Sequence, residues 1–360
     1  MNNRIILLIE NLGSGGAERQ LTGLAVMLKQ HGYEVVVAYY VKKEFYVPFL
    51  DEHGVKHHFL SEGSNPKTRL FALRRYLHRQ NPDTVISYSA SPSIITCLLK
   101  RFGAKWKLIV SERNTTQILC NREKIKFFFY RWADVIVPNS QSQAIFIANH
   151  FPKLTSKVNV ITNFVDTVKF SPSQEPINKH DVLKMVCVGR LMPQKNLPRF
   201  IEAVAKVLRD GYKVYVDWYG QDLEDDYSKE VHNEIIKLGI GESFIFHQPS
   251  DKIQEEYRAA DVFCLPSLYE GFPNTLCEAM SCGKPVLCSR VCDNPNIVAE
   301  GKNGLTFDPL SSDNIADTIE KYISLPEMTR YDMERLSREI AVNMFSQESF
   351  IQKYINILEE

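Results

Sequence analysis

The chain has 360 residues, of which 44% are apolar and 24% are charged, and its formal net charge is zero. This is the composition of an ordinary globular protein that is long enough for two hydrophobic cores, and its eight cysteines are too few for a disulfide scaffold. No stretch approaches the roughly 20 apolar residues of a membrane-spanning helix, and the first residues lack a signal-peptide pattern, so we expect a cytoplasmic protein.

The first half of the chain predicts a parallel sheet. Residues 5–9 form a short apolar run, a glycine-rich loop follows at residues 13–16, and apolar residues then recur at helical spacing up to Leu28. A second apolar run at residues 35–41 completes a βαβ unit. Further strands are predicted at residues 84–87, 107–110, 134–137 and 158–162, and further helices at residues 69–79, 93–101 and 141–149. Such alternation is typical of a sheet covered on both faces.

The same alternation returns after a polar connector over residues 163–181. Strands are predicted at residues 183–188, 214–219, 244–247, 262–265 and 285–289, and helices at residues 197–210, 227–238, 253–260, 274–281, 315–325 and 346–358. The α/β pattern therefore predicts two Rossmann-like domains at residues 1–165 and 166–345, with a C-terminal helix in residues 346–360 that packs back toward the first domain. We expect a deep cleft between the carboxyl edges of the two sheets, where ligands of such sheets bind.

The loop from Gly13 to Glu18 resembles a dinucleotide-binding fingerprint but has Glu18 where the last glycine should fall. Glycines at a helix start let backbone N–H groups approach a phosphate or a sugar hydroxyl, so Gly15 and Gly16 are candidate ligand-binding residues. A tight strand-to-helix turn without a ligand is the alternative.

A second loop, after the strand at residues 183–188, carries Arg190 and Lys195. A diphosphate leaving group gains negative charge as its bond to a sugar breaks, and two fixed cations stabilise that charge without a metal. The alternative is a pair of solvated surface cations, which is the usual state of such residues.

Two glutamates, Glu270 and Glu278, bracket a glycine–proline turn that opens a helix. Free N–H groups at that helix start suit a phosphate, Glu278 suits paired ribose hydroxyls, and Glu270 would face the transferred sugar. An ordinary helix cap with one structural glutamate is the alternative. The candidate donor-binding residues of this segment are Glu270, Gly271, Phe272, Asn274, Thr275, Leu276 and Glu278.

Together these motifs resemble glycosyltransferase family 4, whose members share the GT-B fold and a motif of two glutamates separated by seven residues. The resemblance covers the whole chain, because residues 13–18, 138–140, 163–166 and 189–195 stand in the family's order. It implies retaining transfer from a nucleoside diphosphate sugar, with no metal and no NAD. It assigns Arg190 and Lys195 to the diphosphate, Glu278 to the ribose and Glu270 to the sugar, and brings Gly15 and Gly16 to the phosphate from the other domain.

One position departs from that family pattern. Many relatives have a histidine that contacts the reacting sugar after the strand at residues 107–110, and this chain has Arg113 there. Either Arg113 contacts the departing phosphate, or Glu112 or Asn114 faces the cleft instead. No covalent nucleophile is predicted.

The charge is unevenly divided: residues 1–165 hold 22 Lys and Arg against 11 Asp and Glu, and the rest hold 21 against 32. A basic first domain is attracted to anionic surfaces. Within it, residues 121–132 mix aromatic side chains with Arg122, Lys124, Lys126 and Arg131, as in an interfacial helix, unless the aromatic residues belong to the core. Relatives with this glycine loop commonly extend lipid-linked glycans for capsule, O-antigen or protein glycosylation, so we expect a glycan or polyprenyl-diphosphate-linked acceptor at the inner face of the plasma membrane.

Three other functions fit the sequence less well. An NAD-dependent oxidoreductase is disfavoured because this chain lacks the last glycine of the fingerprint and the acidic residue expected after the strand at residues 35–41. Non-catalytic two-lobed binding proteins are usually exported, and the first residues of this sequence show no signal-peptide pattern. Nucleic-acid binding is disfavoured because the sequence contains no recognition module. No metal is expected, since the four cysteines from Cys277 to Cys292 fit no zinc spacing. For the donor, the resemblance favours a uridine diphosphate (UDP) sugar and leaves guanosine diphosphate mannose open.

Overall fold

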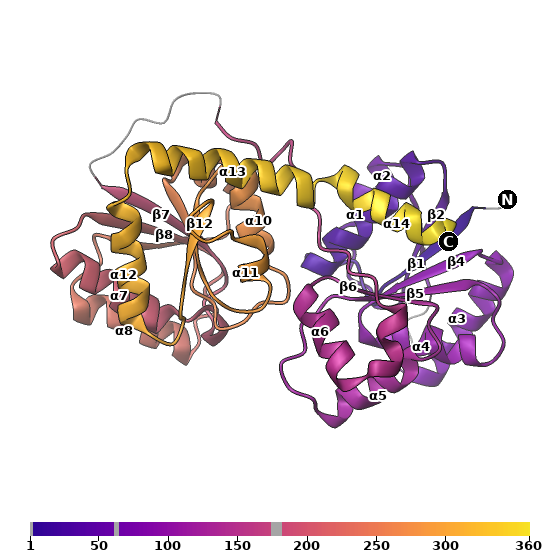
Figure 1. Ribbon diagram of the computed structural model, residues 1–360. Coiled ribbons are helices and arrows are strands. Elements are labelled where there is room, and N and C mark those ends of the chain that lie inside the picture. Colours follow the sequence, from indigo (N-terminus) through magenta and orange to yellow (C-terminus); the bar gives the residue numbers. More distant parts are fainter. Residues whose placement is uncertain (1–2, 61–64, 174–181) are drawn as a thin grey trace. The chain divides into compact units, whose positions relative to one another are not determined.

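A computed structural model describes residues 3–60, 65–173 and 182–360. The chain divides into two compact units, which we call unit 1 (Met1–Phe164 and Glu348–Glu360) and unit 2 (Val165–Gln347), and Figure 1 shows both. The predicted boundaries at residues 165 and 345 lie next to these divisions. Part of the expected connector, residues 174–181, lies outside the described residues.

Unit 1 contains a six-stranded sheet in the order β3-β2-β1-β4-β5-β6, and every neighbouring pair is parallel. Its strands are β1 (Arg4–Leu8), β2 (Glu34–Tyr39), β3 (Lys56–Phe59), β4 (Thr84–Tyr88), β5 (Lys107–Glu112) and β6 (Val135–Pro138). In the central strands β1, β4 and β5 every residue except Arg4 and Lys107 is buried, and apolar runs supply most of their residues, as expected for a sheet covered on both faces.

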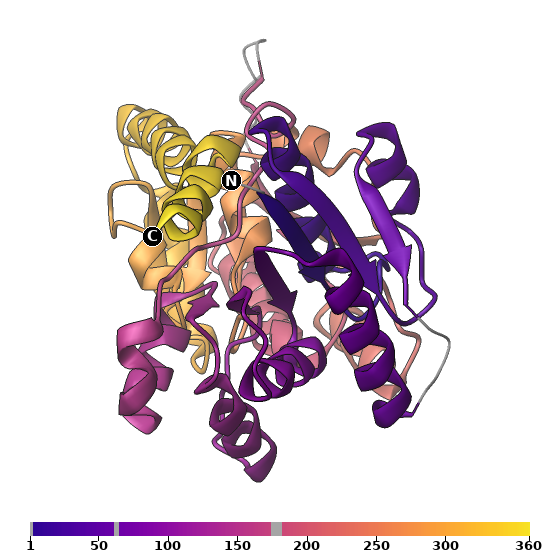
Figure 2. The ribbon, with the colours of Figure 1, turned by 90° about the vertical axis from the view of Figure 1, so that its right-hand side faces the viewer.

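Helices cover both faces of the unit 1 sheet, as Figures 1 and 2 show. They are α1 (Gly16–Gln30), α2 (Val47–Glu52), α3 (Pro66–Gln80), α4 (Ala90–Arg101), α5 (Asn121–Tyr130), α6 (Gln141–His150), the 3₁₀ turn η1 (Pro152–Lys157) and α14 (Gln347–Glu359). One core joins the sheet to α1, α2 and α14, and a second joins it to α3, α4, α5 and α6. The C-terminal helix α14 belongs to unit 1 because Phe350, Ile351, Tyr354 and Ile357 are buried in the first of these cores.

Unit 2 repeats the architecture with the strand order β12-β11-β10-β7-β8-β9, again parallel throughout. Its strands are β7 (Leu183–Val188), β8 (Val214–Tyr219), β9 (Phe244–His247), β10 (Val262–Leu265), β11 (Val286–Ser289) and β12 (Gly304–Phe307). Its helices are η2 (Pro193–Lys195), α7 (Leu197–Arg209), α8 (Asp226–Leu238), α9 (Ile253–Ala259), α10 (Asn274–Ser281), α11 (Asn294–Ile297), α12 (Ser312–Ile323) and α13 (Glu327–Phe345). The predicted fold class, two Rossmann-like α/β domains, is confirmed.

The sequence predictions missed some elements and misjudged one. The predicted strand at residues 158–162 is wrong: this segment runs beside β6 but makes only an isolated bridge, between Val158 and Ile136. The strands β3 and β12 lie at the sheet edges and are four residues long, so they carry little periodicity. The helix α13 was also not predicted.

Among the described residues, no helix is long and apolar enough to cross a membrane.

Candidate functional site

In unit 2, the loop after β7 lies tightly against the loop after β8. The indole Nε1 of Trp218 donates a hydrogen bond of 2.7 Å to the carbonyl of Gly189. A side chain at Gly220 would place its Cβ only 1.9 Å from that carbonyl oxygen, so this position requires glycine. The backbone that precedes Arg190 is therefore held in one place at the carboxyl edge of the sheet.

The structure brings Lys195 and Glu270 together at this edge. The Lys195 Nζ lies 2.7 Å from Glu270 Oε1, and the two side chains are only 14% and 9% exposed. A Cβ at Gly189 would lie 2.8 Å from Lys195 Cε, so the lysine stem passes directly over that glycine. The pair is thus a largely buried charge-assisted hydrogen bond beside the Gly189 loop.

Three further hydrogen bonds hold the two loops that carry this pair. The backbone N–H of Leu268 donates to Gln194 O at 2.8 Å, and the Gln194 side chain donates to Tyr269 O at 2.7 Å. The buried Asn196, whose φ is +57°, donates to Pro266 O at 3.1 Å. The lysine loop and the glutamate loop are therefore positioned as one body.

Arg190 is exposed, and no hydrogen bond or ion pair to it is found in the part of the chain that the structure describes. Its guanidinium can therefore meet an incoming anion without first breaking an ion pair within unit 2.

The start of α10 offers two backbone donors. The N–H of Asn274 donates to Phe272 O at 2.9 Å, so it is not free as the sequence prediction required. The N–H groups of Thr275 and Leu276 make no hydrogen bond with any described residue. The side chains of Phe272 and Leu276 are buried in the unit 2 core, so only their backbone can contact a ligand.

Glu278 lies one turn into α10 and is buried, and its carboxylate accepts a hydrogen bond of 3.4 Å from Tyr257. The backbone N–H of Glu270 faces the sulfur of Cys292 at 3.5 Å. The two glutamates therefore sit in different environments, Glu270 beside a lysine and Glu278 beside a tyrosine.

Sequence reasoning missed Ser267, which follows β10 at the same edge. Its side chain is fully buried, and its hydroxyl has no hydrogen-bond partner among the described residues. Native structures rarely leave such groups unsatisfied, so this hydroxyl is an additional candidate ligand contact. The signal was a serine two residues after a buried strand at the carboxyl edge of a parallel sheet.

In unit 1, the glycine loop is shaped around Glu18. A Cβ at Gly15 would lie 2.1 Å from the Glu18 carboxylate, which folds back over this glycine, the N-cap of α1. Burial raises the pKa of the Glu18 carboxyl. Gly16 begins the helix. The Gly15 N–H donates to Gly13 O at 2.9 Å and is not free. The loop therefore presents the Glu18 carboxyl group at the start of α1, and a carboxylate favours hydroxyl groups over phosphate.

Arg113 is buried in a network that joins four segments of unit 1. Its guanidinium donates to Ser111 Oγ at 2.6 Å, Asn163 Oδ1 at 2.9 Å, Tyr88 OH at 3.0 Å and Tyr354 OH at 2.7 Å. Burial raises the pKa of Tyr88 well above its usual value, so this phenol stays neutral. Arg113 thereby ties α14 to β4 and β5, and these hydrogen bonds are internal to the unit.

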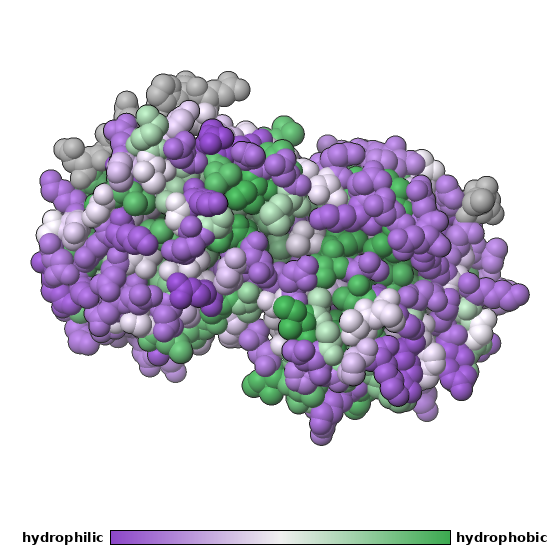
Figure 3. All heavy atoms as spheres, viewed as in Figure 1, coloured by the Kyte–Doolittle hydropathy of each residue, from purple (hydrophilic) through white to green (hydrophobic). Residues whose placement is uncertain are grey.

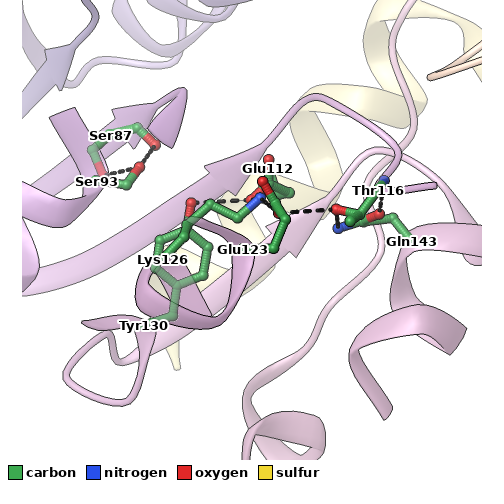
Figure 4. Close-up of polar contacts among 8 residues, drawn as sticks. All are labelled: Ser87, Ser93, Glu112, Thr116, Glu123, Lys126, Tyr130 and Gln143. Atoms are coloured by element: carbon green, nitrogen blue, oxygen red, sulfur yellow. Dashed lines mark hydrogen bonds and ion pairs between the residues drawn. The ribbon is translucent and has the colours of Figure 1, made fainter. Parts of the chain in front are cut away.

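Glu112 and Lys126 form a second buried network, shown in Figure 4. Lys126 Nζ lies 2.9 Å from Glu112 Oε2 and also pairs with Glu123, and Tyr130 OH donates to Glu112 at 3.0 Å. Burial opposes the charge of Lys126, but the two carboxylates raise its pKa above the usual value. Thr116 extends the network by donating to Glu123 at 3.2 Å.

This burial overturns two sequence predictions. Lys126 is 4% exposed and Glu112 is 2% exposed, so neither lies on an open surface. The reason is that the two charges neutralise each other inside the layer between α5 and β5, which a residue-by-residue reading of the charges does not reveal.

The other acceptor and membrane candidates of unit 1 remain at the surface. Asn114, Arg122, Lys124 and Arg131 are exposed. The Arg131 guanidinium lies 4.1 Å from the centre of the Phe128 ring. Hydrophobic side chains are exposed nearby, Ile118 and Ile125 among them, and Figure 3 shows green patches at this end of unit 1.

Family models match both parts of the chain. Residues 14–169 match the model described as Glycosyltransferase Family 4, and residues 170–338 match the model described as Glycosyl transferases group 1.

Relatives and solved structures point the same way. The chain is 27% identical over 79% of its length to the amylovoran biosynthesis glycosyltransferase AmsD of Erwinia amylovora, covering 80% of that protein. It is 28% identical over 77% of its length to a Campylobacter jejuni protein, covering 76% of it. That protein is named GalNAc-alpha-(1->4)-GalNAc-alpha-(1->3)-diNAcBac-PP-undecaprenol alpha-1,4-N-acetyl-D-galactosaminyltransferase. The fold matches Anabaena HepE in complex with UDP, with a TM-score of 0.87, 21% identity and 99% of each chain covered.

Proposed function

Since the chain belongs to glycosyltransferase family 4, we propose that it moves a hexose or N-acetylhexosamine from a UDP-sugar to a lipid-linked glycan, with retention and without a metal. The observation that carries this proposal is the convergence of Lys195, Glu270 and the free amides of α10 on loops at one edge of the unit 2 sheet. Ligands of parallel α/β sheets bind at that edge.

The proposed role of unit 2 is to bind the donor and stabilise its leaving group. As the bond to the sugar breaks, negative charge develops on the diphosphate, and Arg190 and Lys195 supply compensating cations. The N–H groups of Thr275 and Leu276 add a helix N-terminus, which favours phosphate.

The two glutamates would divide the recognition of the donor. Glu278 accepts hydrogen bonds from the ribose hydroxyls and Glu270 from the transferred sugar. The ion pair with Lys195 keeps Glu270 in place before the donor arrives. Hydrogen bonds from the sugar would then compete with that pair, so donor binding and the cation for the leaving group are coupled.

In unit 1, we propose that the exposed side chain of the loop after β5 contacts the ligand and that the buried side chain supports this loop. Asn114 is exposed and would face the acceptor or the donor sugar, whereas Arg113 is a positioning residue that fixes the same loop to β4 and α14. Gly16 would bring its backbone amide to the donor, whereas the Gly15 N–H already donates to Gly13 O at 2.9 Å, so Gly15 would serve only by letting the backbone approach closely. We assign no covalent nucleophile.

The acceptor proposal rests on the relatives. The Campylobacter protein carries a diphospho-undecaprenol acceptor in its name, and HepE was crystallised with UDP. The basic first half of the chain suits an anionic membrane surface, so we propose that the enzyme works as a peripheral protein at the cytoplasmic face of the membrane.

A thermal-shift screen with UDP-sugars and guanosine diphosphate mannose tests the donor. A ligand at a hundred times its dissociation constant stabilises the folded protein by about 2.7 kcal/mol. We expect a shift with one UDP-sugar, unchanged by a chelator, and its loss in Arg190→Ala. An unchanged shift in Arg190→Ala removes this residue from the site, and no shift with any sugar nucleotide contradicts the donor proposal. The anomeric configuration of the product, measured by NMR, tests retention.

A further inference from the structure

The outer face of α3 is basic along its whole length. The helix has fifteen residues and none is acidic. Leu73, Tyr76 and Leu77 are buried against the sheet, which leaves the opposite face to solvent. That face carries Phe71, Arg74, Arg75, His78 and Arg79, at the three- and four-residue spacing that aligns side chains along one stripe of a helix. We call these five residues the α3 stripe.

The arginines of the α3 stripe have no carboxylate partner in the part of the chain that the structure describes. No ion pair to Arg74, Arg75 or Arg79 is found among the described residues. By contrast, Lys206 and Lys237 of unit 2, which are half-buried and exposed, have carboxylate partners at 2.7 and 3.1 Å. Three unpaired arginines on adjacent turns repel one another, which costs stability unless an anionic partner compensates.

The stripe also has an apolar anchor. Phe71 is 65% exposed, and the five side chains line an open hollow of about 460 Å³. An aromatic ring beside several arginines is typical of a helix that lies in a membrane interface, where the ring enters the acyl boundary and the cations contact the headgroups. A binding groove for nucleic acid would stack bases on aromatic rings, and the stripe has only one.

We infer that the α3 stripe is a docking surface for anionic phospholipid headgroups. The inference deepens the proposed function, because it names the surface through which an enzyme acting on a lipid-linked acceptor would reach the bilayer. The argument is charge complementarity: near an anionic surface each Lys or Arg contributes about 1 kcal/mol, or roughly a fivefold change in partitioning.

The helix α5 is the competing surface in unit 1. It exposes Ile125 and Phe128, but its Lys126 is buried and paired with glutamates. Its remaining exposed cations are Arg122 and Lys124, and Arg131 follows the helix. The α3 stripe therefore concentrates more unpaired positive charge, and α5 serves as the matched comparison in the test.

Co-sedimentation of the full chain with phospholipid vesicles tests the inference. We expect binding to vesicles that contain phosphatidylglycerol, weak binding to phosphatidylcholine alone, and loss of binding at high salt. The triple variant Arg74→Gln, Arg75→Gln, Arg79→Gln should lower partitioning by roughly 100-fold. Phe71→Ser should lower it as well, without the change in salt dependence.

Two control variants keep the result specific. Arg209→Gln with Lys321→Gln removes exposed cations from unit 2 and should leave binding unchanged. Arg122→Gln with Lys124→Gln removes the cations of α5, and a loss confined to this variant overturns the assignment to α3. Binding of a single-stranded oligonucleotide through the stripe, with no vesicle binding, also overturns it.

The thermal shift with UDP-sugar separates this inference from the proposed function. The triple variant should keep that shift, because the α3 stripe is not part of the donor site. If the shift is present in the native chain and vesicle binding is absent, the docking surface fails while the donor assignment stands. If the chain binds vesicles and no sugar nucleotide gives a shift, the donor assignment fails while the docking surface stands.

Discussion

The carboxyl edges of the two sheets use charged residues in opposite ways. In unit 2, Lys195 and Glu270 form a largely buried pair beside Arg190, which is exposed and has no ion pair with any described residue. In unit 1, Arg113, Glu112 and Lys126 are buried in networks that connect helices to the sheet. The charged residues near the strand ends of unit 2 are therefore the proposed ligand contacts, whereas those of unit 1 tie helices to the sheet, and the difference is set by what packs over each edge.

The largest effect expected from this contrast is a loss of stability when Lys126 is replaced. The change Lys126→Met leaves Glu112 and Glu123 as uncompensated carboxylates in a buried layer, which should destabilise unit 1 by about 3–5 kcal/mol. Urea unfolding, combined with hydrogen exchange in α5, measures this. Lys124→Met on the same helix is the matched control and should change stability by less than about 0.5 kcal/mol, because its side chain is exposed. Equal stability of both variants would show that Lys126 is not buried in solution.

The next largest effect is expected on kcat/KM when Lys195 is replaced. Lys195→Ala removes a cation from the proposed leaving group and should lower kcat/KM by about 10²–10³-fold, a loss typical of one preorganised electrostatic contact. Steady-state transfer assays check this, once the donor is known. Lys206→Ala breaks an ion pair of the same length, with Asp313, on an exposed surface of unit 2 and should leave kcat/KM unchanged. A similar loss in both variants would mean that unit 2 as a whole had been disturbed.

A smaller effect is expected for Tyr354. Tyr354→Phe removes the hydroxyl that accepts from Arg113 and contacts Tyr88 at 3.1 Å, which should cost about 1.5–3 kcal/mol. Hydrogen exchange should become faster in α14 and in the loop after β5, while the proposed thermal shift with a UDP-sugar should stay the same. Tyr331→Phe, at an exposed position, is the control. Unchanged exchange in α14 would contradict the positioning role of Arg113.

The sequence predicted the positions of the candidate residues of unit 2 better than the surroundings of those in unit 1. The cations Arg190 and Lys195 and the glutamates Glu270 and Glu278 lie within two continuous segments that follow strands of unit 2, so local pattern was enough to place them at one edge. The partners of Arg113 come from residues 88, 111, 163 and 354. No local pattern links positions that far apart, so its burial could not be foreseen.

The sequence by itself determined the two parallel α/β sheets, because buried strands and amphipathic helices each leave a local periodicity. It also determined which residues stand at strand ends, where ligands of such sheets bind. Only the tertiary structure decided which of those residues remain available. Packing of α5 over β5 buries Lys126 and Glu112 as a pair, and packing of α14 buries Arg113. The arginines of the α3 stripe stay at the surface with no ion pair to any described residue. The physical reason is that charge pairing and burial depend on neighbours from distant parts of the chain.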